Sequence, residues 1–302
     1  MTNTAHDGSP DLSMLSTLIG APVVAAERCG WGFENETLLV TLAHGDHLIV
    51  QRLAAGPLAA HKLYLGQVLP PRLAAVGITA PRLLATNATA NAPYAVREYL
   101  PGEPAASRMS TLPGSVLAAS AMGTLLPRLA QVSTAGLELS TAWAAPATLA
   151  QHAQDMLARC KPLLAASTIA PLVATIAELP GLFAERPAVF AHGDFCPVNA
   201  LLDGAHVVGL LDLEFARMTD ALFDAAWWGW VVRYHHAGRW ASAWPKLLAA
   251  AGIANDTATN LRIASLQRLR CLEMLDYHAH WRSSGRAAMW AERLQTTLQW
   301  QY

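Results

Sequence analysis

The sequence predicts an α+β protein of two lobes, with a small strand-rich first third and a larger, mainly helical remainder. Short apolar runs with β-branched residues, two of them joined by a Gly-Asp turn, occupy the region of residues 37–99. Ala- and Leu-rich stretches with helical spacing follow. The segment Leu100-Pro101-Gly102-Glu103-Pro104 separates the two regions. We therefore predict one lobe over residues 1–102 and a second over residues 103–302.

Composition narrows the class of protein. The chain has 302 residues, of which 53% are hydrophobic, and a formal net charge of -1. Such a chain is long and apolar enough to bury a large core, and it is not disordered. No basic patch for nucleic acid and no apolar stretch of membrane-spanning length is present. The four cysteines have no metal or redox spacing and the N-terminus has no signal peptide, so we expect a soluble, cytoplasmic protein with reduced thiols.

The first lobe is expected to begin with a short helix over residues 12–20. Two strands, 37–42 and 47–53, form a hairpin around His44-Gly45-Asp46. A helix over 58–76 follows, which Pro70-Pro71 should break or kink. Two further strands are expected at 80–85 and 94–99.

The second lobe is expected to be helical apart from one β insertion over residues 188–214. Its helices are predicted over residues 115–132, 148–166, 171–179, 240–251, 257–281 and 286–300. Another helix should follow Asp224, and its Trp227, Trp228 and Trp230 have the spacing of core residues.

The β insertion contains the residues that indicate chemistry. It reads HGDFCPVNALL, with Asp194 and Asn199 five residues apart, and the next apolar strand ends in Asp212. Phosphoryl transfer from a nucleotide needs a carboxylate that positions and deprotonates the attacking hydroxyl. It also needs an amide oxygen and a second carboxylate to hold Mg²⁺ against the phosphates. His192-x-Asp194-x4-Asn199 has the spacing of the protein-kinase catalytic loop.

These segments resemble the aminoglycoside phosphotransferase and choline kinase-like family, small-molecule kinases of the protein-kinase-like fold. HGDFCPVNALL, GLLDLEFA and the following Asp224-Ala225-Ala226 are the strongest part of the resemblance. GWGFENETLLV is similar to the family's phosphate-covering hairpin, GITAPRLLA to the stretch before the hinge, and REYLPGEP to the hinge. The resemblance implies transfer of the γ-phosphoryl group of ATP or GTP to a hydroxyl of a small molecule, such as an antibiotic, a sugar or an amino alcohol.

In the second lobe, the resemblance assigns the catalytic base to Asp194. It assigns the Mg²⁺ ligands to Asn199 and Asp212. His192 would brace the catalytic loop, and Asp224 would hold the loop after the metal site.

In the first lobe, the resemblance assigns nucleotide contacts. Glu98 and Leu100 would meet the adenine through backbone groups, while Gly30 and Gly32 would cover the phosphates.

The third strand departs from the family's pattern. The family usually has a Lys there that contacts the phosphates and pairs with a Glu of the next helix. Here Arg52 is the candidate, with Gln51 in its place if the register slips by one residue. The helix over 58–76 has no Glu, and Gln67 is the nearest substitute.

Two other classes of protein stay open. A nucleotide-binding pseudokinase would explain the missing helix Glu and the ambiguity between Gln51 and Arg52. A metal-dependent hydrolase would use His192, Asp194 and Asp212, although such sites generally draw on more ligands.

Two further assignments stay open. Glu214 belongs to the metal site or points away from it. We expect most charges of the predicted helix over 257–281, including Arg270, Glu273 and Asp276, to form a solvated face.

Overall fold

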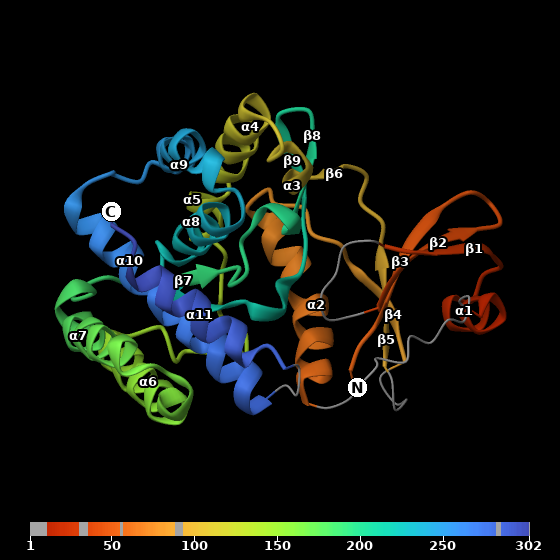
Figure 1. Cartoon of the computed structure of the whole chain (residues 1–302). Coiled ribbons are helices and arrows are strands. Elements are labelled where there is room, and N and C mark those ends of the chain that lie inside the picture. The colour runs from red at the N-terminus through yellow and green to blue at the C-terminus, as the bar shows by residue number, and fades with distance from the viewer. Residues whose placement is uncertain (1–10, 30–35, 55–56, 88–92, 282–284, 302) are drawn as a thin grey trace.

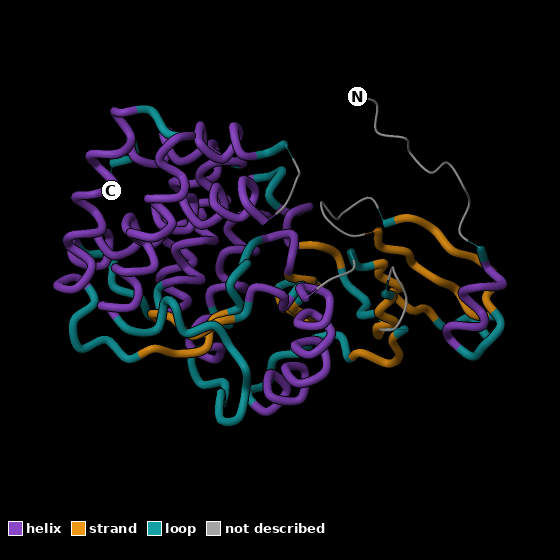
Figure 2. Tube along the Cα trace, turned by 90° about the horizontal axis from the view of Figure 1, so that it is seen from below, coloured by secondary structure: helices purple, strands orange, loops and turns teal. Residues whose placement is uncertain are grey.

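The structure is a computed structural model, and it describes residues 11–29, 36–54, 57–87, 93–281 and 285–301. The protein has two lobes (Figures 1 and 2). The smaller lobe is a five-stranded antiparallel sheet in the order β1-β2-β3-β5-β4. Its strands are β1 (Val23–Arg28), β2 (Glu36–Leu42), β3 (His47–Arg52), β4 (Leu83–Thr86) and β5 (Tyr94–Glu98). The expected α+β class with a strand-rich first lobe is confirmed. The sequence analysis missed β1, a largely exposed strand whose VVAAER sequence lacks a clear alternation.

The two faces of this sheet have different neighbours. Helix α1 (Leu12–Ile19) inserts Leu15 into a cluster with Val40, Val50 and Val96 on one face. Helix α2 (Pro57–Ala75) packs against Ala95 on the other face. Figure 1 shows α2 between the sheet and the helical lobe.

Helix α2 continues through Pro70 and Pro71, so the expected break is absent. Leu65, Leu69 and Leu73, each one turn apart, are fully buried in the main core of the protein. Burial of this stripe offsets the hydrogen bonds that the prolines cannot make.

The larger lobe is mainly helical, as expected. Its helices are α3 (Ala105–Arg108), α4 (Leu112–Gly123), α5 (Leu126–Leu129), α6 (Pro146–Cys160), α7 (Ala166–Leu182), α8 (Phe223–His235), α9 (Ala237–Ala251), α10 (Thr257–Asp276) and α11 (Ala287–Leu298), with the 3₁₀ turn η1 (Lys161–Leu163) and the π-helical turn η4 (Tyr277–Trp281). The helix expected over 115–132 is instead two helices. Pro127 has no N–H to donate to the carbonyl of Gly123, where α4 ends.

Short strands carry the loops of interest. They are β6 (Glu103–Pro104), β7 (Ala188–Ala191), β8 (Ala200–Asp203), β9 (His206–Leu210) and β10 (Arg217–Asp220), with the 3₁₀ turns η2 (Pro197–Asn199) and η3 (Leu213–Phe215). β6, β8 and β9 form one sheet, and β7 pairs with β10. The division of the chain after residue 102 stays a prediction. No helix of the described residues is long and apolar enough to cross a membrane.

Candidate active site

Hydrogen bonds with buried polar groups hold the loop between β7 and η2. Asp224, at the start of α8, accepts hydrogen bonds from the backbone N–H groups of His192 (2.7 Å) and Gly193 (3.0 Å). The His192 ring accepts from the Asp194 N–H through Nδ1 and donates through Nε2 to the carbonyl of Leu211. Both ring nitrogens are therefore used, and His192 has none left for a metal ion. This removes the imidazole ligand that the hydrolase hypothesis needs.

Gly193 fits where another residue would not. Its φ is +84°, in the left-handed region, and an added Cβ would lie 1.9 Å from the carbonyl oxygen of Phe215. The glycine thus lets the loop pass directly against η3, which follows Asp212.

The Asp194 carboxylate has a donor on each oxygen. Asn199 Nδ2 donates to Oδ2 at 2.8 Å, and Trp227 Nε1 donates to Oδ1 at 2.6 Å. Two donors fix the plane of the carboxylate. The amide of Asn199 is thereby oriented with its nitrogen toward Asp194, which leaves the oxygen of Asn199 as its remaining acceptor.

Asp212 lies close to two other acidic groups. It has a left-handed backbone (φ 59°) where β9 leads into η3. The residue as a whole is exposed, while desolvation of its carboxyl group by the surrounding protein raises the pKa of that group from 3.8 to about 8. The Glu214 and Asp194 carboxylates add to this shift, while Lys62 and Arg97 oppose it. Such a group is poised to accept a cation.

Glu214 belongs to this cluster and does not point away from it. It forms an ion pair with Lys62 of α2, and the two side chains are only 8% and 10% exposed. The sequence analysis left Glu214 open and did not consider Lys62. The ion pair joins α2 to the loop after Asp212.

The candidate cation Arg52 lies elsewhere. Successive residues of a strand point to opposite faces, so Arg52 and Gln51 diverge. Arg52 lies 3.8 Å from Glu36, and its side chain is 47% exposed. Gln51 shares the α2 face of the sheet and accepts a hydrogen bond from Arg97 Nε at 3.0 Å. The structure thus does not bring Arg52 together with Asp194 and Asp212. Gln67, the suggested helix partner, is exposed.

Of the remaining residues predicted to contact the nucleotide, the structure describes Glu98 and Leu100. Gly30 and Gly32 lie outside the described residues. The Glu98 side chain forms an ion pair with Arg82, which lowers the pKa of Glu98. Leu100 lies at the junction of the lobes against Gly209 of β9.

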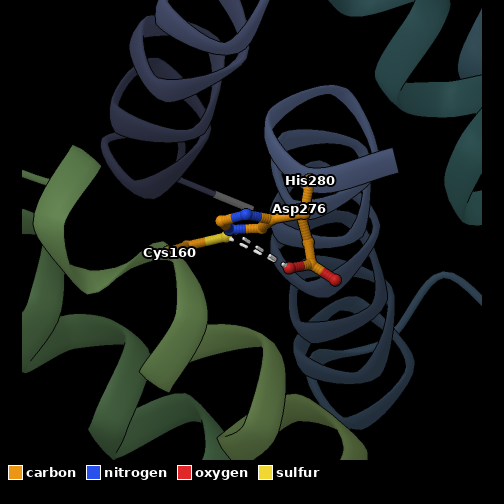
Figure 3. A group of neighbouring side chains, drawn as sticks. All are labelled: Cys160, Asp276 and His280. Carbon is orange, nitrogen blue, oxygen red and sulfur yellow. Dashed lines mark hydrogen bonds and ion pairs between the residues drawn. The ribbon is translucent and has the colours of Figure 1, made fainter. Parts of the chain in front are cut away.

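A second group of potential metal ligands lies apart from this loop, on α6, α10 and η4 (Figure 3). It consists of Cys160, Asp276 and His280. Asp276 is already bound in a two-fold contact by Arg159, at 2.9 and 2.7 Å. Burial raises the pKa of Cys160 to about 12, so the thiolate that a metal prefers is not formed at neutral pH. We interpret this cluster as a structural link between α6 and α10.

The charges of α10 are not a solvated face, and that expectation is wrong. Arg270 and Asp276 are buried, and Glu273 accepts from Arg217 at 2.7 and 2.9 Å. Arg270 also contacts Glu273. Their opposite signs let these groups be buried together, which a helix pattern alone does not reveal.

Three residues of the site were not predicted to contact it. Trp227 was expected in the core and lies there, but its hydrogen bond to Asp194 was not foreseen. Lys62 and Arg97 were not considered. An aromatic spacing gives no sign that an indole N–H reaches a carboxylate, and the two cations come from separate elements.

The fold and the site define a small-molecule kinase. A model of the phosphotransferase enzyme family matches residues 25–264. The chain belongs to this family, which confirms the resemblance stated from the sequence.

Solved structures agree in fold. A wild-type aminoglycoside 2′-phosphotransferase in complex with GDP has 15% sequence identity and a TM-score of 0.76, covering 96% of this chain and 99% of that one. A macrolide 2′-phosphotransferase from Brachybacterium faecium has 15% identity and a TM-score of 0.68, with 96% and 98% coverage. A thermostable mutant of an aminoglycoside phosphotransferase in complex with ADP and hygromycin B has 13% identity and a TM-score of 0.71, with 95% and 97% coverage. At these identities the likeness shows the fold alone. No curated protein matches the chain.

Proposed function

We propose that the protein transfers the γ-phosphoryl group of ATP or GTP to a hydroxyl of a small molecule, with Asp194 as catalytic base. The observation that carries this proposal is the Asp194 carboxylate, held by Asn199 and Trp227 beside Asp212. A carboxylate fixed in this way can accept the proton of an incoming hydroxyl and orient its oxygen toward the phosphorus. Asn199 and Trp227 donate hydrogen bonds without giving up their protons, so the Asp194 carboxylate can still accept the proton of the hydroxyl.

The donor set fits Mg²⁺. The oxygen of Asn199 and the carboxylate of Asp212 are hard oxygen ligands, the kind that Mg²⁺ prefers. Asp212 sits among like charges that a divalent cation would relieve. When bound, the ion would neutralise charge on the donor phosphates.

The environment of Asp212 makes Mg²⁺ binding dependent on pH. Because the pKa of the free carboxyl group is about 8, Mg²⁺ must displace a proton below that pH. We expect the apparent affinity for Mg²⁺ to rise by about fivefold from pH 7 to pH 8, as the ionised fraction of Asp212 rises. The measurement is the Mg²⁺ activation constant of the phosphotransferase reaction at each pH. In Asp212→Asn, any remaining activation should lose this dependence; an activation constant of the wild type that is flat with pH contradicts the assignment.

The pocket beside the site bears on the acceptor. Phe215, Met274 and Tyr277 give it apolar walls. Its three cations, Lys62, Arg217 and Arg270, outnumber its two carboxylates, Glu214 and Glu273. A polycation gains little from such walls. We therefore favour a neutral or weakly charged alcohol over a polycationic aminoglycoside.

The deciding experiment is a thermal-shift titration with ATP and GTP, each with and without Mg²⁺. A ligand that binds the native state raises the Tm, and we expect a Mg²⁺-dependent rise with one nucleotide or both. ADP or GDP release is then measured with kanamycin, neutral sugars and amino alcohols as acceptors. A Tm that moves with neither nucleotide refutes the kinase assignment. Nucleotide binding with no release on any acceptor favours the pseudokinase, which the absence of a cation from the α2 face of β3 also suggests.

A further inference from the structure

One cation of the small lobe reaches the acidic cluster from an unexpected strand. Arg97 lies on β5, next to β3, on the face of the sheet that α2 covers. Its Nε–H donates to Gln51 Oε1, and among the described residues this is the only hydrogen bond or ion pair of its side chain. The terminal amino groups of the guanidinium are therefore available to a ligand.

The neighbouring helix leaves room for this guanidinium. A Cβ on Gly66 of α2 would lie 2.6 Å from Nη1 and 2.8 Å from Nη2 of Arg97. Any other residue at position 66 would push the guanidinium away. Gln51 thus holds Arg97 by a hydrogen bond, and Gly66 leaves the space that its guanidinium occupies.

The charge of Arg97 acts on the loop that carries Asp212 and Glu214. Burial lowers the pKa of Arg97, and the Asp212 and Glu214 carboxylates are the main influences that raise it again. Lys62, the other cation nearby, forms an ion pair with Glu214. Arg97 differs from it in forming no ion pair to a carboxylate among the described residues, and its terminal amino groups have no hydrogen-bond partner there.

We propose that Arg97 contacts the donor phosphates, in place of a cation from the third strand, with Gln51 and Gly66 as its positioning residues. This inference rests on the proposed function. A planar guanidinium presents paired donors that match phosphate oxygens. Helix α2 has a cation, Lys62, rather than an anion in this region. Lys62 would contact the loop after Asp212 through its ion pair with Glu214, and Arg97 would then contact the nucleotide.

The test compares a nucleotide with its own nucleoside. Binding of ADP, GDP, adenosine and guanosine to the full chain is measured in the presence of Mg²⁺. Arg97→Met should lower the affinity for the diphosphate that the wild type binds by about 10- to 100-fold. Its affinity for the corresponding nucleoside should stay within about twofold of the wild-type value. The affinity of Arg97→Lys for the diphosphate should lie between that of the wild type and that of Arg97→Met. Gly66→Ala should repeat the pattern more weakly, because it moves the guanidinium without removing it.

Two comparisons isolate the role of Arg97. Arg28→Met removes an exposed arginine of β1 and should change neither affinity. Arg52→Met tests the rival cation directly. Equal weakening of nucleoside and diphosphate in Arg97→Met would mean a structural role and would overturn the inference. So would a phosphate-specific loss in Arg52→Met with none in Arg97→Met. Wild-type protein that binds neither diphosphate would instead refute the proposed function, before any variant is compared.

Discussion

Replacing Asp194 by asparagine is expected to lower kcat by about 10²- to 10⁴-fold, the usual contribution of a general base. The substituted amide cannot take a proton from the acceptor. Turnover should therefore fall while nucleotide binding and Tm change little. Steady-state kinetics beside a nucleotide-dependent thermal shift measure both.

A carboxylate of the same loop region provides the control. Asp203, nine residues further along and exposed at the end of β8, should tolerate the same change with unaltered kcat. If Asp194→Asn turns over at a near-normal rate, Asp194 is not the base. If it loses nucleotide binding and Tm along with turnover, the carboxylate is structural.

Glu273→Gln is expected to destabilise the protein by about 3–5 kcal/mol, as measured for broken buried ion pairs. Glu273 is 19% exposed and faces Arg217 and Arg270, which are 7% and 2% exposed. An amide would leave two buried guanidinium groups without their counter-charge. Trp143 Nε1 also donates to this carboxylate, so α10 is tied to the segment before α6. Urea unfolding at pH 7 gives the difference in free energy.

The same variant predicts a pH dependence. The neighbouring arginines lower the pKa of Glu273 from 4.5 to about 2 against the effect of its burial. A carboxyl group with a depressed folded-state pKa stabilises the protein fully above the unfolded pKa and loses this contribution as the pH falls. The gap between wild type and Glu273→Gln should therefore narrow from pH 4.5 towards pH 2.

The partly exposed Glu36 supplies the comparison for Glu273. It contacts Arg28 and Arg52 on the outer part of the small sheet. Glu36→Gln should cost less than about 1 kcal/mol. A cost of that size for Glu273→Gln as well would show that its ion pairs contribute little.

Much of the fold could be read directly along the chain. The β2–β3 hairpin, helix α2 and the β insertion that contains β8 and β9 depend on short-range patterns of apolar residues and turns, and they lie where such patterns predicted them. The loop that we propose to carry the catalytic base was also predictable, because phosphoryl transfer requires residue types at fixed local spacing. Strand β1 and the split between α4 and α5 were missed, since a mostly exposed edge strand and a proline near a helix start leave weak signals.

The sequence by itself thus determined the two-lobed α+β class, the family, and the segment that carries Asp194, Asn199 and Asp212. Only the tertiary structure decided which groups surround them. Strand pairing turned Arg52 to the outer face and Gln51 to the inner one. It also brought Arg97 from β5, Lys62 from α2 and Trp227 from α8 to the same loops. The physical reason is that a side chain's direction depends on strand register and helix packing, which are set by contacts between residues far apart in the chain.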